Sequence, residues 1–170
     1  MNDLAQQLSR IDLCAGLTRP ELFRLLEAGR VETWPSNSVI MEEGSSGPRL
    51  VILLEGEVKV YKSKQLMAEL GPGTVLGEMS LLRDAPRSAS VVAHTELRLF
   101  AIDRRTFEEM AGDGDPAALK LGLSMARVLA RRVADLNLKV VELLGQGQQD
   151  DQGETDDVVL RPRILRAGRG

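Results

Sequence analysis

The chain has 170 residues, which is enough for one domain with its own core and leaves little for a second. Apolar residues make up 43% of it, so we exclude a chain that is disordered throughout. A formal net charge of −3 argues against a uniformly basic partner surface, and the single cysteine, Cys14, excludes an internal disulfide framework or a cysteine-rich zinc site. The first ten residues lack the pattern of a signal peptide, and no apolar stretch reaches the roughly 18 residues that a membrane helix needs. We therefore expect a cytoplasmic protein.

The N-terminal segment, residues 1–30, is predicted to be helical. Its apolar residues recur at helical spacing, with Leu4, Leu8 and Ile11 on one face and Leu22, Leu25 and Leu26 on another. Thr18 and Glu21 have the spacing of a capping box, and Pro20 falls in the first turn that would follow. A short helix should therefore begin after Thr18.

Residues 31–102 have the pattern of a β-structure, because short apolar runs alternate with turn residues. The runs are Val31–Trp34, Val39–Met41, Leu50–Leu54, Val58–Tyr61, Met67–Leu70, Val91–Ala93 and Leu97–Ala101. Antiparallel hairpins that close into a roll bury such an aliphatic interior and protect the sheet edges. The predicted fold class is therefore mainly β, an antiparallel, jelly-roll-like β-roll with helices on either side of it in the chain.

The segment 103–145 is predicted to be helical again. Asp103 can cap a short helix that runs to about Met110, and a glycine-rich break follows at residues 112–116. Asp115 can cap a second helix of about 30 residues, with Pro116 in its first turn. The last segment, 146–170, is polar and has an acidic and then a basic cluster, so we expect a disordered tail.

The most informative segment is Gly77 to Ala93, which contains the strings Gly-Glu-Met-Ser-Leu-Leu and Pro-Arg-Ser-Ala-Ser-Val. The start of a helix offers unpaired backbone N–H groups to an anion, and glycine lets a ligand approach closely. The Glu78 carboxylate can accept a hydrogen bond from a ligand hydroxyl, while the Arg87 guanidinium suits phosphate oxygens. These residue types together fit a ligand that carries both a sugar hydroxyl and a phosphate, although a surface helix with a Glu–Arg pair is the plainer interpretation of any one of them.

The ordered string, at residues 77–91, closely resembles the phosphate-binding cassette of cyclic nucleotide-binding domains. Such domains occur in the catabolite activator family, in the regulatory subunit of cAMP-dependent protein kinase and in cyclic nucleotide-gated channels. The resemblance covers about residues 5–145 and includes Gly44, Leu54–Val58 and Leu70–Gly73. Two positions depart from the family pattern: Leu76 stands where an aromatic residue is common, and Ser80 where alanine is common.

The resemblance implies a role for each matching residue. Glu78 should accept the ribose 2′-hydroxyl, and Arg87 should pair with the cyclic phosphate. Backbone amides near five residues should surround the phosphate and sugar: Gly77, Met79, Ser80, Ser88 and Ala89. We favour cAMP over cGMP as the ligand, but Ser88 does not decide between them. No further cofactor and no metal are expected, since the only histidine, His94, lies between two predicted strands without a second one to share an ion.

The long helix shows two apolar stripes, which predict two neighbours. A heptad seam runs through Leu119, Gly122, Ala126, Leu129, Val133, Leu136, Val140 and Leu143, and a second stripe through Leu121, Met125 and Val128. We expect the second stripe to pack on the roll and the seam to form a two-fold homodimer, the alternative being a helix buried within one monomer. By resemblance to the catabolite activator family, Arg132 is expected to pair with Glu78, and Asn137 to contact the adenine.

The function predicted from these features is that of a non-enzymatic cyclic nucleotide receptor that signals through movement of its C-terminal helices. A truncated or atypical transcription regulator of the catabolite activator type is the main alternative, and a scaffold with the fold but no ligand is a third. Residues after Gly145 show no helix-turn-helix pattern, so we do not expect DNA as a partner. The signal should pass to a separate protein that the sequence does not identify.

Overall fold

The structure, a computed structural model, describes residues 1–82 and 86–147, with side chains up to residue 142. It divides into two compact units, the first ending at Arg131 and the second beginning at Arg132. Nearly all of the predicted tail, 146–170, therefore lies outside the described residues. Within the described ranges, no helix has the length and apolar character needed to cross a membrane.

Two short helices precede the sheets, as predicted from the apolar spacing: α1 (Asn2–Ser9) and α2 (Arg19–Ala28). The capping box of α2 is confirmed, because the backbone N–H of Thr18 donates to the Glu21 carboxylate at 2.7 Å. Cys14, in the connection between the helices, is fully buried, and burial raises the pKa of its thiol to about 12. It is a small core residue rather than a reactive thiol.

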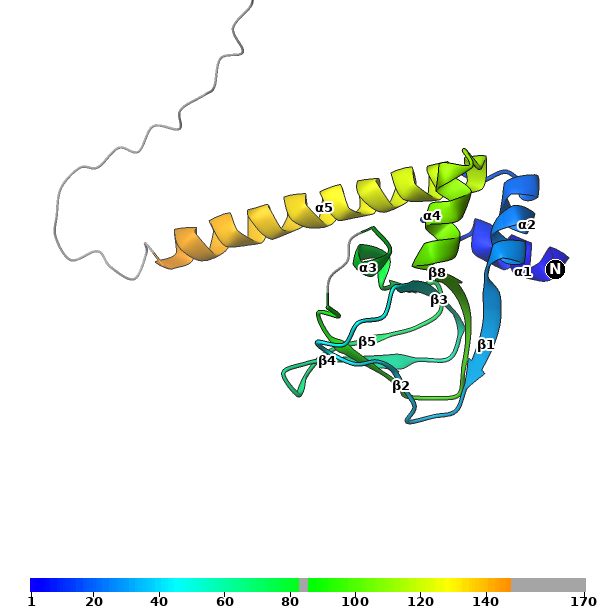
Figure 1. Cartoon of the computed structure of the whole chain (residues 1–170). Helices are drawn as coiled ribbons and strands as arrows, with labels where there is room; N and C mark the ends of the chain where they lie inside the picture. The colour runs from blue at the N-terminus through cyan, green and yellow to red at the C-terminus, as the bar shows by residue number, and fades with distance from the viewer. Residues whose placement is uncertain (83–85, 148–170) are drawn as a thin grey trace, which may run out of the picture. The chain divides into compact units, whose positions relative to one another are not determined.

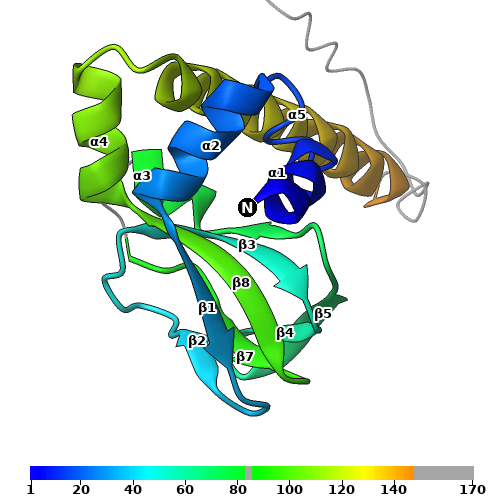
Figure 2. The same ribbon diagram turned by 90° about the vertical axis from the view of Figure 1, so that its right-hand side faces the viewer.

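The strands form two antiparallel four-stranded sheets that face each other as a roll (Figures 1 and 2). The first sheet has the order β1-β8-β3-β6, and the second has the order β2-β7-β4-β5. The strands are β1 (Arg30–Trp34), β2 (Val39–Met41), β3 (Arg49–Glu55), β4 (Val58–Lys62), β5 (Gln65–Leu70), β6 (Val75–Leu76), β7 (Ser90–Ala93) and β8 (Leu97–Asp103). Every predicted strand is present. The two-residue β6 was not predicted, because a run that short has no measurable period.

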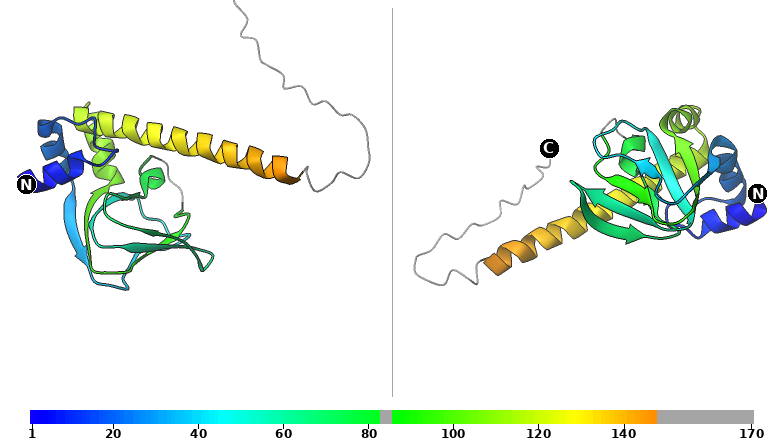
Figure 3. Two further views of the ribbon diagram at one scale, coloured as in Figure 1. Left: turned by 180° about the vertical axis from the view of Figure 1, so that it is seen from behind. Right: turned by 90° about the horizontal axis from the view of Figure 1, so that it is seen from below.

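Alternating residues of β3 serve two separate cores. Leu50, Ile52 and Leu54 belong to a cluster shared with the helices, while Val51 and Leu53 belong to the interior of the roll. A strand that is covered on both faces is apolar at every position, which explains the unbroken run from Leu50 to Leu54. Figures 1 and 3 show α1, α2 and α4 together at the helix-covered end of the roll.

Three further helices follow the sequence predictions: α3 (Glu78–Leu82), α4 (Arg104–Gly112) and α5 (Pro116–Gly147). Asp115 caps α5 as expected, since its carboxylate accepts a hydrogen bond from the Ala117 N–H at 2.8 Å. Asp103 occupies the N-cap position of α4, but its side chain makes no capping bond and pairs with Arg30 at 2.6 Å instead. The predicted second stripe of α5 is confirmed where Leu121 and Met125 lie fully buried in the helix-side core.

Candidate functional site

Arg87 lies at the centre of the predicted site and is fixed by its own backbone. Its N–H donates to the carbonyl of Ser45 at 2.9 Å, and its carbonyl accepts from the N–H of Gly44 at 2.8 Å. These two bonds tie the segment after α3 to the loop between β2 and β3. The side chain points inward, and the residue is only 7% exposed.

The Arg87 guanidinium is buried with part of its hydrogen-bonding capacity unused. Nη1 donates to Ser80 Oγ at 2.6 Å, and Nη2 donates to the main-chain carbonyl of Arg49 at 3.0 Å. Nε has no hydrogen-bond partner among the described residues. Burial lowers the pKa of Arg87 below its usual value, the charge of Arg49 lowers it further, and the charge of Glu78 acts in the opposite direction. A buried cation in this state favours an anion beside it.

Two glycines make room for the Arg87 side chain. Gly77 has φ +77°, and a Cβ there would collide with Arg87 Nη1 and lie 2.5 Å from the carbonyl oxygen of Arg49. A Cβ on Gly47 would lie 3.2 Å from Arg87 Nε. Gly77 is therefore required twice, for its left-handed backbone and for the close approach of the guanidinium.

Helix α3 places two buried polar side chains next to Arg87 in the sequence pattern that was predicted. Glu78 and Ser80 are 7% and 6% exposed, while Met79 between them is exposed. Besides accepting from Arg87, the Ser80 hydroxyl donates to the Gly77 carbonyl at 2.9 Å. The sequence analysis expected a role for the backbone amide near Ser80 and none for its side chain, but the structure shows that the Ser80 hydroxyl holds the guanidinium.

The remaining predicted residues are less closely connected to this centre. Ser88 is exposed and Ala89 is half-buried, directly after Arg87. Arg132 and Asn137 lie in the second unit, on an exposed stretch of α5. Their predicted contacts with Glu78 and with an adenine therefore stay predictions. His94 lies on an exposed loop between β7 and β8, as expected.

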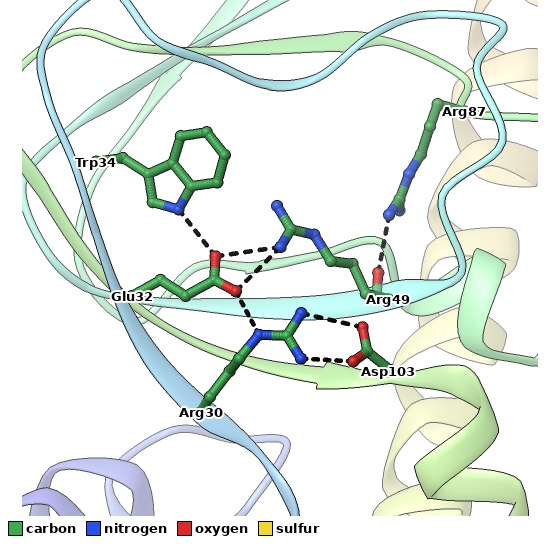
Figure 4. Close-up of polar contacts among 6 residues, drawn as sticks. All are labelled: Arg30, Glu32, Trp34, Arg49, Arg87 and Asp103. Atoms are coloured by element: carbon green, nitrogen blue, oxygen red, sulfur yellow. Dashed lines mark hydrogen bonds and ion pairs between the residues drawn. The ribbon is translucent and has the colours of Figure 1, made fainter.

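Figure 4 shows a cluster of charged residues near Arg87 that the sequence analysis did not identify, formed by Arg30, Glu32, Arg49 and Asp103. Glu32 accepts from Arg30 Nε at 2.7 Å, from Trp34 Nε1 at 2.9 Å, and from Arg49 Nη1 at 3.1 Å and 3.2 Å. Arg49 also lies over the Trp34 ring, with its guanidinium carbon 5.7 Å from the ring centroid. The signal for this cluster was the alternation of Arg30, Glu32 and Trp34, which places all three on one face of β1.

The arrangement suits the binding of a ligand that carries an anionic group and a hydroxyl. A buried carboxylate and a buried guanidinium lie within one short segment, and the guanidinium has an unused donor. A group of His, Cys, Asp or Glu side chains that could hold a metal ion is absent from the described part of the chain.

Comparison with known proteins identifies the segment. Residues 31–113 match the family model described as "Cyclic nucleotide-binding domain". The regulatory subunit of cAMP-dependent protein kinase from Pyricularia oryzae is 31% identical over 111 residues, which are 64% of this chain and 28% of that protein. A cGMP-dependent protein kinase of Caenorhabditis briggsae is 29% identical over 139 residues, which are 76% of this chain and 18% of that protein.

Bacterial proteins also match. A CRP-like cAMP-activated global transcriptional regulator of Mycobacterium tuberculosis is 26% identical over 142 residues, 81% of this chain and 62% of that protein. The crystal structure of the Thermus thermophilus catabolite activator protein superposes with a TM-score of 0.70 at 28% identity, covering 78% of this chain and 62% of that one. The chain thus spans less than two thirds of each of these relatives. Residues 31–113 of the chain belong to the cyclic nucleotide-binding domain family.

Proposed function

We propose that this chain is a receptor for a cyclic nucleotide, with cAMP preferred over cGMP, and that it carries out no chemistry of its own. One observation carries the proposal: the buried Arg87 guanidinium keeps an unused Nε donor beside the buried Glu78, inside the segment that matches the family. A cyclic phosphate brings the acceptors that Arg87 lacks, and its ribose brings a hydroxyl for Glu78. The relatives include proteins named for cAMP and proteins named for cGMP, so they do not decide between the two nucleotides. The proposed preference for cAMP rests on the predicted contact of Asn137 with the adenine.

The signal is proposed to leave through the C-terminal helices. The break between α4 and α5 contains Gly114 at φ +74°, a conformation that favours glycine and suits a hinge. A ligand that contacts both the cassette and α5, through Arg132 and Asn137, would favour the arrangement in which both contacts form. This mechanism is wrong if spin-label distances between the roll and α5 do not change when cAMP is added.

A homodimer through α5 forms part of the proposal. Four large apolar seam residues that the structure describes are exposed: Leu119, Val133, Leu136 and Val140. A row of large apolar side chains at heptad spacing is costly in water and is covered when a second copy of the helix packs against it. Sedimentation of the full chain should show a dimer, which Leu136→Asp should weaken.

Calorimetric titration with cAMP and cGMP tests the receptor function. The wild-type chain should bind cAMP, and Arg87→Lys should bind at least tenfold more weakly, because lysine keeps the charge but loses the guanidinium fork. Arg105→Lys is the matched control, since the Arg105 side chain is 90% exposed on α4. If the folded wild-type chain binds neither nucleotide by calorimetry and fails to displace a fluorescent analogue, the proposal is wrong.

A transcription regulator is the second candidate, favoured by the 142-residue match to the CRP-like regulator. In that case the basic cluster near the C-terminus would contact DNA phosphates. Binding of a generic duplex that weakens steeply with salt and disappears on deleting residues 146–170 would support this alternative.

A further inference from the structure

The charged cluster behind the site, defined as Arg30, Glu32, Arg49 and Asp103, has an uneven charge balance. Arg30 has two acidic partners, because Nη1 contacts Asp103 at 2.6 Å and Nε contacts Glu32 at 2.7 Å. For Arg49, Glu32 is the acidic partner that the structure shows, at 3.1 Å. If Glu32 lost its charge, Arg30 would still be neutralised by Asp103, and the Arg49 charge would stand alone.

The charge of Arg49 reaches the binding site. Its main-chain carbonyl accepts from Arg87 Nη2 at 3.0 Å, so the two residues are in direct contact. Both arginines are largely shielded from water, since the Arg49 side chain is 19% exposed and Arg87 is 7% exposed. The Arg49 guanidinium extends from the same residue toward Glu32 (Figure 4), and its charge is the second cause, after burial, that lowers the pKa of Arg87. An anion bound at Arg87 is attracted by Arg49 in the same way.

We propose that Glu32 lowers the affinity of the site for its anion, because it holds the Arg49 guanidinium and offsets the charge of that guanidinium near Arg87. This inference rests on the proposed function. Glu32 is well placed for this role, since it accepts hydrogen bonds from Arg30, Trp34 and Arg49 and stays ionised. Burial by itself raises the pKa of Glu32, but the hydrogen bonds from Trp34 and Arg30 and the charge of Arg49 hold it below its usual value. The site thus binds its anion less tightly than its arginines would allow.

A double-mutant cycle of Glu32→Gln and Arg49→Gln tests the inference, with cAMP and inorganic phosphate as probes. Glutamine keeps acceptors for Trp34 and the arginines but removes the charge. Glu32→Gln should bind either probe about threefold to tenfold more tightly at low salt, and the gain should shrink toward zero at about 1 M salt. Arg49→Gln alone should bind either probe more weakly than the wild type, and the double variant should return to within about twofold of the wild type, because the two opposite charges are then removed together.

Glu55→Gln is the matched control, because Glu55 lies on the same strand as Arg49 and pairs with Arg98 at the surface. It changes the net charge equally and should leave affinity within about twofold of the wild type. Unchanged or weaker binding by Glu32→Gln overturns the inference, as does an Arg49→Gln variant that binds the probes as tightly as the wild type. If the wild type binds phosphate but not cAMP, the proposed function fails and the phosphate titrations alone decide the inference. If it binds neither probe, both are overturned.

Discussion

Replacing Ser80 with alanine would remove the contact that holds Arg87 in the free protein. The Ser80 hydroxyl is buried, accepts from Arg87 Nη1 at 2.6 Å and donates to the Gly77 carbonyl at 2.9 Å. In the variant, Nη1 joins Nε as a buried donor without an acceptor. Because an unpaired buried donor costs about 1–3 kcal/mol, we expect the free energy of unfolding to fall by about 2 kcal/mol.

The ligand should reverse part of this loss. A cyclic phosphate at Arg87 offers new acceptors to the guanidinium, so the complex depends less on Ser80 than the free protein does. By linkage, every 1.4 kcal/mol or so that the ligand restores appears as about tenfold tighter binding by the variant. Ser80→Ala is thus expected to be less stable than the wild type and to bind cAMP more tightly.

Urea unfolding of both proteins, with and without saturating cAMP, measures the two effects. Trp34 is the chain's only tryptophan and reports the transition by fluorescence. Ser9→Ala is the control, because the Ser9 hydroxyl makes a similar bond to the Gln6 carbonyl at 2.7 Å on the exposed surface. It should change stability by less than about 0.5 kcal/mol. An equal loss of stability by Ser80→Ala with and without cAMP would refute the reasoning.

Three further predictions follow from the fold. Gly77→Ala and Gly73→Ala both place a Cβ on a residue with positive φ, but only the Cβ at 77 has atoms within 4 Å. The backbone conformation should cost each variant about 1 kcal/mol of stability. Gly77→Ala should lose further stability through its steric contacts and should also fail to bind cAMP in a titration. Leu121→Ala should cost about 2–5 kcal/mol in urea unfolding, because Leu121 is fully buried at the start of α5, whereas Leu123→Ala, 52% exposed, should cost under about 1 kcal/mol. The pKa of Glu32 is lower in the folded protein than in the unfolded chain, so Glu32 stabilises the protein above the unfolded pKa, and this stabilisation is lost as the pH falls through the folded pKa. In thermal unfolding between pH 6 and pH 2, the stability of Glu32→Gln should therefore fall less steeply than that of the wild type. Parallel curves for the two proteins would contradict this.

Much of the fold was predictable because its signals are local. The capping box at Thr18, the Asp115 cap and the apolar runs of the strands each involve residues a few positions apart, and each prediction was confirmed. The signal for the cassette is local in the same way, since Gly77, Glu78 and Arg87 fall within 11 consecutive positions of the sequence, and the ligand contacts of these residues stay predictions. Short-range order of this kind is carried by backbone preference and side-chain periodicity.

The sequence by itself thus determined the β-roll and the order of the described helices and strands apart from the two-residue β6. Only the tertiary structure decided how Arg87 is held, through the carbonyl of Arg49, 38 positions away. It likewise decided that Asp103 pairs with Arg30, 73 positions away, instead of capping α4. Such choices depend on which charged groups the strand register brings together, and burial makes those pairings strong enough to override a local preference.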